Sequence, residues 1–519
     1  MRWFNFSALA VCFVLVSCGG GGGSGTANIN TDTEGPLFDY KQIPDNKLRY
    51  CINAIASIKQ LASAKDYTEI DCTDNLYSGK IKDLTGLSNF INLKTLNLSR
   101  VNSDTVAISI YDITEIEKLT LLEELYIDRQ SIDDLSPLRN LSNLRILSLV
   151  RNNVTDTSSL SDLQNLTYLN LSNNAPSTGQ NTLKMTYLAG LTKLETLILD
   201  ENFITDASDI GNIINLKSLS IKYNYINDFT FLNMLTNLEI LDISWQLVTP
   251  SSSGLPNEIS SLTKLKSLYA EKMLRYGSSL DSIASNIELT TISLSHSSFN
   301  DLSPLTNLNK LVSLNLNKTT IKDFSDLSEL SPVKYLYLKG IFINASSEAI
   351  LFSEINALPN IEKLVLTEWS RAINITSLIS NTSLKELSLE SSVGINNLDN
   401  ISSLSNLTNL SIIDPKNITY NISELSSLSE LTELYIDFYI QGSLQPISNL
   451  TNLSSLVIIS RNIDNSYDLM SLVNLTNLVT LRFGDIPNVS CNIWESFKNE
   501  ILKINSDLFI SGGLQCNKF

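Results

Sequence analysis

Apolar residues recur along most of the chain in one frame, Leu-x-x-Leu-x-Leu, which occurs 17 times between residues 93 and 483. Most of the regular units are 22 residues apart, and all three frame positions of every unit are apolar, with Ala270 the weakest. Self-similarity at a short fixed period predicts a stacked repeat array instead of several separate globular domains. The units start at Leu93, Leu122, Leu144, Leu166, Leu194, Leu216, Leu238, Leu265, Leu289, Leu311, Val333, Ile361, Leu384, Leu407, Leu431, Leu453 and Leu478.

Each unit predicts one short strand, because the frame residues point to one side of a strand and the residues between them to the other. A single unit cannot bury its leucine face, so stacked neighbours must build one continuous core. Eight residues after the frame start, four units carry an asparagine: Asn152, Asn174, Asn202 and Asn224. Later units carry Gln246, Met273, Ser297, Thr319 and Trp369 at this place. We therefore expect different turn hydrogen bonding there and a less regular second half.

The frame, the asparagine and the segment Asp-Leu-Ser-Pro-Leu at residues 134–138 and 301–305 resemble the leucine-rich-repeat family, most closely its internalin-like 22-residue class. The resemblance covers roughly residues 67–490. It implies an α/β repeat solenoid with a curved parallel sheet on the concave face and 3-10 helices, short helices and loops on the convex face. It also implies a protein-binding module instead of an enzyme, although a fold does not identify the partner.

Longer steps of 27 to 29 residues mark insertions after Leu93, Leu166, Leu238 and Val333. In the last insertion, residues 346–357 begin with serines suited to cap a helix and continue with a helix-compatible stretch. We expect this stretch to form a helix on the convex face. Because no linker interrupts the array, the sequence predicts one solenoid over residues 93–490, between an N-terminal cap of residues 46–92 and a C-terminal cap of residues 491–519.

The caps are needed because the ends of a solenoid expose its core and its strand edges. The N-terminal cap has helical periodicity over residues 47–64, followed by a degenerate first strand in the repeat frame. The helix positions are Leu48, Cys51, Ile52, Ile55, Ile58 and Leu61, and the strand positions are Tyr67, Ile70, Cys72 and Asn75. In the C-terminal cap, Cys491 begins an expected helix through Trp494, Phe497 and Ile501.

Cysteine pairing follows from this architecture. About 18 strands at a spacing of roughly 4.8 Å separate the two caps by about 85 Å along the sheet. A disulfide needs Cα atoms within about 7 Å, so only Cys51–Cys72 and Cys491–Cys516 can form within one molecule. Such bridges suit an oxidising compartment. The alternative is four free, buried thiols.

The first 17 residues predict an export signal, with Arg2 followed by an apolar stretch too short to span a bilayer. Leu15-Val16-Ser17-Cys18 resembles the lipobox of bacterial lipoproteins, which implies cleavage before Cys18 and lipidation of its thiol. Residues 18–45 then form an expected flexible tether. The alternative is an ordinary signal peptide. Since the residue after Cys18 is Gly19 instead of aspartate, the resemblance favours the outer membrane of the cell envelope.

The net charge and the motifs of the chain limit which partners and which reactions it can have. A net charge of −17 repels phosphate backbones, which argues against nucleic acid as a partner. The chain has one histidine, His296, and lacks the nucleotide-binding, hydrolase, zinc and calcium motifs that sequence can reveal. We therefore expect no catalytic residues, metal or cofactor.

The remaining candidate site is the concave face. Seven residues after the frame start, outward side chains form a column with Arg100, Arg129, Arg151, Tyr223, Trp245, Lys272 and His296, and Tyr269 is expected beside Trp245. Aromatic and arginine side chains are common interface anchors, so we predict that these residues bind a protein ligand. The alternative is cross-strand packing, since aromatics favour strands in any case. Two other functions stay open: binding of a glycan or cell-wall polymer, and a structural spacer in the envelope.

Overall fold

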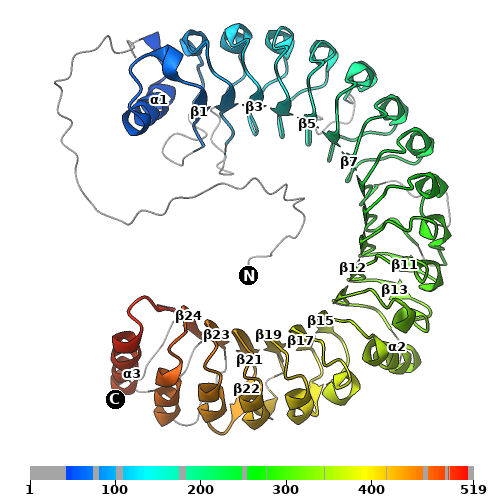
Figure 1. Cartoon of the computed structure of the whole chain (residues 1–519), viewed down its shortest axis with the longest axis vertical. Helices are drawn as coiled ribbons and strands as arrows, with labels where there is room; N and C mark the ends of the chain where they lie inside the picture. The colour runs from blue at the N-terminus through cyan, green and yellow to red at the C-terminus, as the bar shows by residue number, and fades with distance from the viewer. Residues whose placement is uncertain are drawn as a thin grey trace.

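The computed structural model describes residues 42–511 except for residues 74–80, 101–108, 175–182, 248–253, 276, 344, 417, 460–465, 485–488 and 490. The predicted signal peptide, Cys18, most of the tether, Asn75 and Cys516 lie outside the described residues. The described chain bends into a horseshoe with strands along its inner face, helices along its outer face and the two caps at its open end (Figure 1).

Within the described residues, the inner face is one sheet of 19 parallel strands that follow one another in chain order. The strands are β1 (Glu69–Asp71), β2 (Thr95–Asn97), β3 (Glu124–Tyr126), β4 (Ile146–Ser148), β5 (Tyr168–Asn170), β6 (Thr196–Ile198), β7 (Ser218–Ser220), β8 (Ile240–Asp242), β9 (Ser267–Tyr269), β10 (Thr291–Ser293), β12 (Ser313–Asn315), β14 (Tyr335–Tyr337), β15 (Lys363–Trp369), β17 (Glu386–Ser391), β19 (Asn409–Ile413), β21 (Glu433–Asp437), β23 (Ser455–Ile458), β24 (Thr480–Phe483) and β25 (Phe509–Ser511).

The outer face consists mainly of 3-10 helices, one in nearly every unit. They are η2 (Ala64–Asp66), η3 (Leu87–Asn89), η4 (Thr114–Lys118), η5 (Ser136–Leu138), η6 (Ser158–Leu160), η7 (Thr186–Gly190), η8 (Ser208–Asn212), η9 (Thr230–Met234), η10 (Asn257–Ser261), η11 (Asp281–Ile283), η12 (Ser303–Leu305), η13 (Leu327–Glu329), η14 (Ile375–Leu378), η15 (Leu398–Ser403), η16 (Ser423–Ser427), η17 (Gln445–Asn449) and η18 (Ser466–Asn474). The leucine-rich-repeat solenoid expected from the sequence is thus confirmed.

The apolar frame builds the core between these two faces. Equivalent frame residues pair in register from strand to strand, as Leu96 does with Leu125 and Leu125 with Leu147. Every frame residue is buried, and the most exposed of them, Leu98, reaches only 3%. Because each strand lies directly beside its equivalent in the next unit, outward side chains also line up in continuous rows on the concave face.

A turn with left-handed backbone ends each strand in the first part of the array. It falls seven residues after the frame start, and we call this series of residues the turn ridge. Their φ angles lie between +52° and +61°, and from Arg129 to Gly340 each main-chain N–H donates to a carbonyl of the next unit at 2.6 to 3.0 Å. The turn ridge consists of Arg129, Arg151, Asn173, Glu201, Tyr223, Trp245, Lys272, His296, Lys318, Gly340 and Glu368.

The predicted column therefore lies beside the strands and not on them. Left-handed φ turns the chain away from the sheet, so the strands of this sheet from β3 to β14 contain only three residues each. From β15 the strands are longer: β15 contains Glu368 and ends at Trp369, β17 remains extended through Ser391, which occupies the position equivalent to Glu368, and the strands of this sheet from β15 to β24 contain four to seven residues.

Buried asparagines support the turns in the first part of the array. The Asn224 side chain accepts from the N–H groups of Asn202 and Ile204, both at 3.0 Å, and donates to the Leu199 carbonyl at 3.0 Å. Gln246 makes equivalent bonds, accepting from Ile226 N–H at 3.0 Å and donating to the Ile221 carbonyl at 2.9 Å. The expectation that Gln246 alters the hydrogen bonding is therefore wrong.

Beyond Gln246 the hydrogen bonding does change. Short parallel strand pairs now lie on the outer side of the turns and supply backbone bonds in place of the asparagine amide. They are β11 (Ser298–Phe299) with β13 (Thr320–Ile321), β16 (Ile373–Asn374) with β18 (Ile395–Asn396), and β20 (Thr419–Asn421) with β22 (Tyr439–Gln441). The second half thus differs as expected. It contains more strand, its strand lengths vary, and the pairing of β15 with β17 shifts register between Leu366 and Trp369.

A second asparagine series was not anticipated from the sequence. These residues directly precede the frame start, and each side-chain amide donates to a main-chain carbonyl of the preceding unit at 2.7 to 3.0 Å. They are Asn143, Asn165, Asn215, Asn237, Asn360, Asn406, Asn452 and Asn477. The bonds tie the edge of each unit to its neighbour.

The N-terminal cap is the helix α1 (Asn46–Lys59), which buries Leu48, Cys51 and Ile52. The helix ends earlier than expected because Gln60 adopts a left-handed conformation, and Ile58 is 82% exposed instead of buried. The bridge between Cys51 and Cys72 is confirmed, with Cα atoms 5.7 Å apart.

The insertion helix and the C-terminal cap also match expectation. The helix α2 (Ala345–Ala357) packs on the outer side beside η13 and η14 (Figure 1). The helix α3 (Cys491–Ile504) buries Trp494, Phe497 and Ile501, and the Trp494 ring lies 5.7 Å from that of Phe483. Strand β25, which pairs with β24, was not predicted.

Two further observations concern the ends of the chain. Cys491 is disulfide-bonded, but the predicted partner, Cys516, is outside the described residues. Among the described residues, no helix combines the length and apolar character needed to cross a membrane.

Candidate ligand-binding surface

Three of the predicted aromatic and basic residues meet around the indole of Trp245 on the turn ridge. Tyr223 stacks on Trp245 with ring centroids 5.4 Å apart and planes inclined by 21°. The Lys272 Nζ atom lies 4.6 Å from the centroid of the Trp245 ring, and the His296 ring lies 5.1 Å from it. Trp245 Nε1 donates to Glu271 Oε2 at 3.2 Å. We call Tyr223, Trp245, Lys272 and His296 the ridge cluster.

The order of these residues along the ridge limits what Trp245 can contact. Tyr223 comes from the preceding unit and Lys272 from the following unit, so the indole has a neighbour on each side. A sugar ring could stack on the indole face beside Lys272 only after displacing that side chain. The tyrosine is 37% exposed and Lys272 and His296 are exposed, so these groups remain open to a partner.

His296 is the one histidine of the chain, and its ring contacts Trp245 in the ridge cluster. Partial burial lowers the pKa of its imidazole, and the positive charges of Lys318 and Lys272 lower this pKa further. At pH 7 the ring is therefore neutral and serves as a polar aromatic surface.

Tyr269 does not join the ridge cluster. It lies on β9, directly between Asp242 on β8 and Ser293 on β10, and makes no ring contact with Trp245 within the described residues. Tyr269 thus lies on the strand next to that of Trp245, as expected, but their rings do not meet, because Trp245 follows its strand in the turn whereas Tyr269 projects from the sheet. Burial raises the pKa of the Tyr269 phenol, with further contributions from Asp242 and Glu271.

The predicted arginines occupy the start of the array. Arg129 and Arg151 belong to the turn ridge, and Arg100 N–H donates to the Asp128 carbonyl at 3.1 Å. Burial raises the pKa of the Asp128 carboxyl, while the positive charge of Arg129 partly opposes this shift. The structure thus places Arg129 beside an acid, separate from the ridge cluster.

Sequence reasoning missed a second set of residues on the strands. Tyr126 and Tyr168 project from the concave face near Asp128 and Asp200, and their phenol pKa values are raised by burial and by neighbouring acids. The available signal was the periodicity itself, since the positions two, four and six residues after the frame start all face outward.

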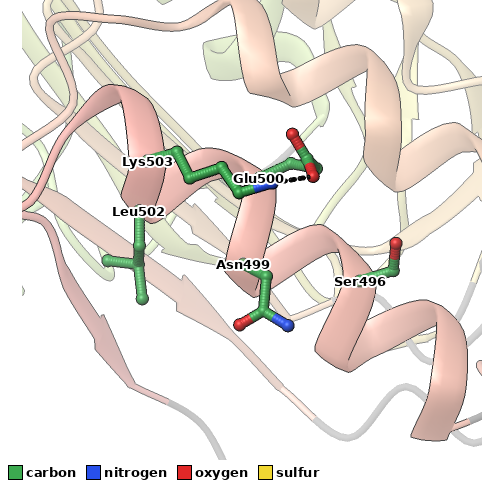
Figure 2. Close-up of a pocket in the computed structure, with 5 residues that line it drawn as sticks. All are labelled: Ser496, Asn499, Glu500, Leu502 and Lys503. Atoms are coloured by element: carbon green, nitrogen blue, oxygen red, sulfur yellow. Dashed lines mark hydrogen bonds and ion pairs between the residues drawn. The ribbon is translucent and has the colours of Figure 1, made fainter.

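Two shallow hollows lie away from these residues. One is on the outer side of α3, where Lys503 pairs with Glu500 at 2.6 Å and Leu502 is partly exposed (Figure 2). The other lies where Glu362 pairs with Lys334 and Lys385 at 2.7 and 2.9 Å. In the part of the chain that the structure describes, no group of three or more His, Cys, Asp or Glu side chains is placed to hold a metal ion.

Comparisons with known proteins agree with the fold. No family model and no curated protein matches the sequence. An internalin from Listeria monocytogenes is similar in structure, with a TM-score of 0.55 and 25% sequence identity over 72% of this chain and 97% of that chain. A leucine-rich-repeat protein of Leptospira interrogans has a TM-score of 0.50 and 20% identity over 82% of this chain and 97% of that chain, which bears on the fold alone.

The frame, the 19-stranded parallel sheet and these similarities identify an internalin-like leucine-rich-repeat fold. In general terms, such a fold supports a protein-interaction module.

Proposed function

We propose that this internalin-like leucine-rich-repeat chain is a non-catalytic, protein-binding module of the bacterial cell envelope. Its anchor is lipidated Cys18, and its partner binds on the concave face and the adjoining turn ridge. The tether begins at Cys18 and ends before the expected residue 45, because Ile43 is buried in the core and Asp45 caps α1. The leader sequence supports the anchor and an outer-membrane location. The boundaries between leader, tether, caps and solenoid are part of the same proposal.

One observation carries the binding role: the inner face is a single, in-register sheet that displays tyrosines, and the ridge cluster adjoins it. Half-buried Tyr and Trp beside polar groups are typical of protein interfaces, because they offer apolar contact area with a hydrogen-bonding group. The core does not require these side chains, since the frame residues already close it.

Glycan binding is less well supported. Recognition of a sugar commonly uses an open aromatic face, and Tyr223 and Lys272 already lie against Trp245. The indole N–H is also engaged, because it donates to Glu271.

Site-specific photo-cross-linking tests the proposed binding face. A benzophenone amino acid replaces Ser218, which projects from β7 on the concave face, or Glu117, which is exposed on η4 on the convex face. We expect protein adducts in envelope preparations from position 218 and not from position 117. Adducts from position 117 alone, or a glycan and no protein at position 218, would contradict the proposal.

A further inference from the structure

The strand register defines a row of neighbouring side chains across the concave face. Four residues after each frame start, the residue pairs with its equivalent on the next strand at a spacing of roughly 4.8 Å. From β3 to β9 this concave row reads Tyr126, Ser148, Asn170, Ile198, Ser220, Asp242 and Tyr269. A tyrosine thus stands at each end of this row, with smaller side chains between them.

Acidic residues dominate the charge of this surface. This surface consists of the outward side chains of β3 to β10 and of the two residues that follow each strand. Its basic residue is Lys222, and its acidic residues are Glu124, Asp128, Asp200, Asp242 and Glu271. Lys222 Nζ lies 3.6 Å from Asp200 Oδ2, so it is already committed to one of these acids. The surface therefore keeps an excess of negative charge beyond its own internal pair.

Two of the acids flank Tyr269. Asp242 is its direct neighbour on β8, and Glu271 follows it by two residues. Both carboxylates accept hydrogen bonds from neutral groups: Asp242 accepts from Ser244 N–H at 3.0 Å, and Glu271 accepts from the Ser293 hydroxyl at 2.8 Å and from Trp245 Nε1 at 3.2 Å. Within the described residues, neither carboxylate has a lysine or arginine within ion-pair distance.

The surroundings of Tyr168 on β5 differ, because both nearby acids have a basic neighbour: Arg129 for Asp128, and Lys222 for Asp200. The direct partners of Tyr168 in the register are Ile146 on β4 and Thr196 on β6, and the charges of Asp128 and Asp200 raise the pKa of its phenol. Asp128 is bonded by the Ser148 hydroxyl at 2.7 Å and by Val150 N–H at 2.9 Å, again neutral donors. Arg129 on the turn ridge offsets part of the Asp128 charge, and Lys222 offsets part of the Asp242 charge.

The surroundings of Tyr269 favour a cation. A partly buried carboxylate without a counter-ion within ion-pair distance is poorly solvated, and burial raises the pKa of the Asp242 carboxyl. A tyrosine ring attracts a cation to its face, and a guanidinium can bond a carboxylate at the same time. A ring between two acids therefore presents complementary charge and shape to a lysine or arginine side chain.

Resting on the proposed function, we propose that the partner is a cationic polypeptide, one of whose lysine or arginine side chains lies between the Tyr269 ring and the carboxylates of Asp242 and Glu271.

Other occupants fit this surface less well. A second copy of the chain has the same net charge of −17 and would bring acids against acids. Nucleic acid is excluded by the same repulsion.

A defined peptide tests the cation preference. The probe is a fluorescein-labelled decapeptide with an Arg-Arg pair at each end and serine and glycine between, and its counterpart carries glutamates in place of the arginines. Binding to the full chain is measured by fluorescence anisotropy at about 150 mM salt, where long-range attraction is largely screened. We expect saturable binding of the arginine peptide and none of the glutamate peptide.

Matched variants locate the contact. Asp242→Asn with Glu271→Gln should weaken the arginine peptide at least about 10-fold. The control is Glu117→Gln with Glu424→Gln, two exposed convex residues, which changes the net charge by the same amount and should weaken binding less than about 2-fold. Tyr269→Leu should weaken binding about 2- to 5-fold through loss of the ring. Circular dichroism confirms that each variant is folded.

Equal weakening by both double variants would overturn the inference, because the peptide would then be attracted to the overall charge of the chain and not to this site. Unchanged binding in both double variants would overturn it as well. The photo-cross-linking experiment separates this failure from failure of the proposed function. If a protein cross-linked from position 218 makes contact through a neutral or acidic segment, the cationic inference fails while concave binding stands. If adducts arise only from position 117, both fail.

Discussion

The left-handed backbone of the turn ridge predicts an inversion of the usual preference between alanine and glycine. At Trp245, where φ is +58°, the side chain carries a steric cost of about 1 to 2 kcal/mol that glycine does not have. Tyr269 lies on strand β9, which pairs with β8, the strand that precedes Trp245. Within a strand, a glycine variant is less stable than an alanine variant by about 0.5 to 1 kcal/mol. We therefore expect Trp245→Gly to be about 1 kcal/mol more stable than Trp245→Ala, and Tyr269→Gly to be less stable than Tyr269→Ala.

The cost of removing the indole itself should be modest. Stacking on Tyr223 and the contact with Lys272 are each worth about 0.5 to 1.5 kcal/mol, and relief of the backbone strain in the glycine variant offsets much of this. Trp245→Gly should thus lower the free energy of unfolding by about 1 kcal/mol or less, and Trp245→Ala by about 2 kcal/mol.

Urea unfolding of the four variants, followed by far-ultraviolet circular dichroism, measures these differences. Comparing Ala with Gly at one position cancels the loss of side-chain contacts and leaves the backbone effect. If glycine is less stable than alanine at both positions, Trp245 is not left-handed and the description of the turn ridge is incorrect.

Four further predictions rest on separate features. Leu241→Ala, at a fully buried frame position, should lower the free energy of unfolding by about 2 to 5 kcal/mol in the same urea assay, and a loss below 1 kcal/mol would contradict close packing there. Cys51→Ser with Cys72→Ser should destabilise the N-terminal cap by about 3 kcal/mol, given a sequence separation of 21, and non-reducing peptide mapping should recover Cys51 with Cys72 and Cys491 with Cys516. Burial raises the pKa of Asp242 to about 6 from an ordinary value of 3.8, so the folded state holds its proton more tightly and loses stability as pH rises from about 4 to 6. Asp242→Asn should consequently be about 1 to 2 kcal/mol more stable than the unaltered chain at pH 7.5, with no advantage below pH 4, and the opposite pH trend in urea unfolding would refute the assignment. Cys18→Ser should move the protein out of the detergent phase on Triton X-114 partitioning, whereas unchanged partitioning after normal signal cleavage would rule out lipidation at this residue.

The solenoid could be predicted from the sequence because the same apolar frame repeats in every unit, so each unit separately indicates the same pattern of buried residues. The Cys51–Cys72 pair could be predicted for a related reason: Cys51 falls on the inner face of a helix and Cys72 on an inward frame position. Both conclusions depend on which side a residue faces, and periodicity determines that.

Backbone conformation at the candidate site was not predictable in this way. Left-handed φ is usually signalled by glycine or asparagine, but on the turn ridge only Asn173 and Gly340 carry that signal, while Tyr223 and Trp245 adopt it without one. Tyr269 was therefore placed beside Trp245, although the turn carries the indole away from the strand. Gln246 shows the converse difficulty, since its longer side chain still reaches the carbonyl and N–H groups that an asparagine bonds elsewhere.

The disulfides near the two ends of the solenoid also affect how the molecule responds to a pulling force. A solenoid under tension loses its units one after another, since each unit contacts only its neighbours, and release of one 22-residue unit adds about 75 Å of extensible chain. Terminal units would ordinarily yield first because they have a neighbour on one side only. The Cys51–Cys72 bridge prevents the first strand from unwinding away from its helix, and the disulfide at Cys491 restrains the other end. Under load, stretching should therefore begin in the interior of the horseshoe, where it lengthens the molecule stepwise while both ends stay folded.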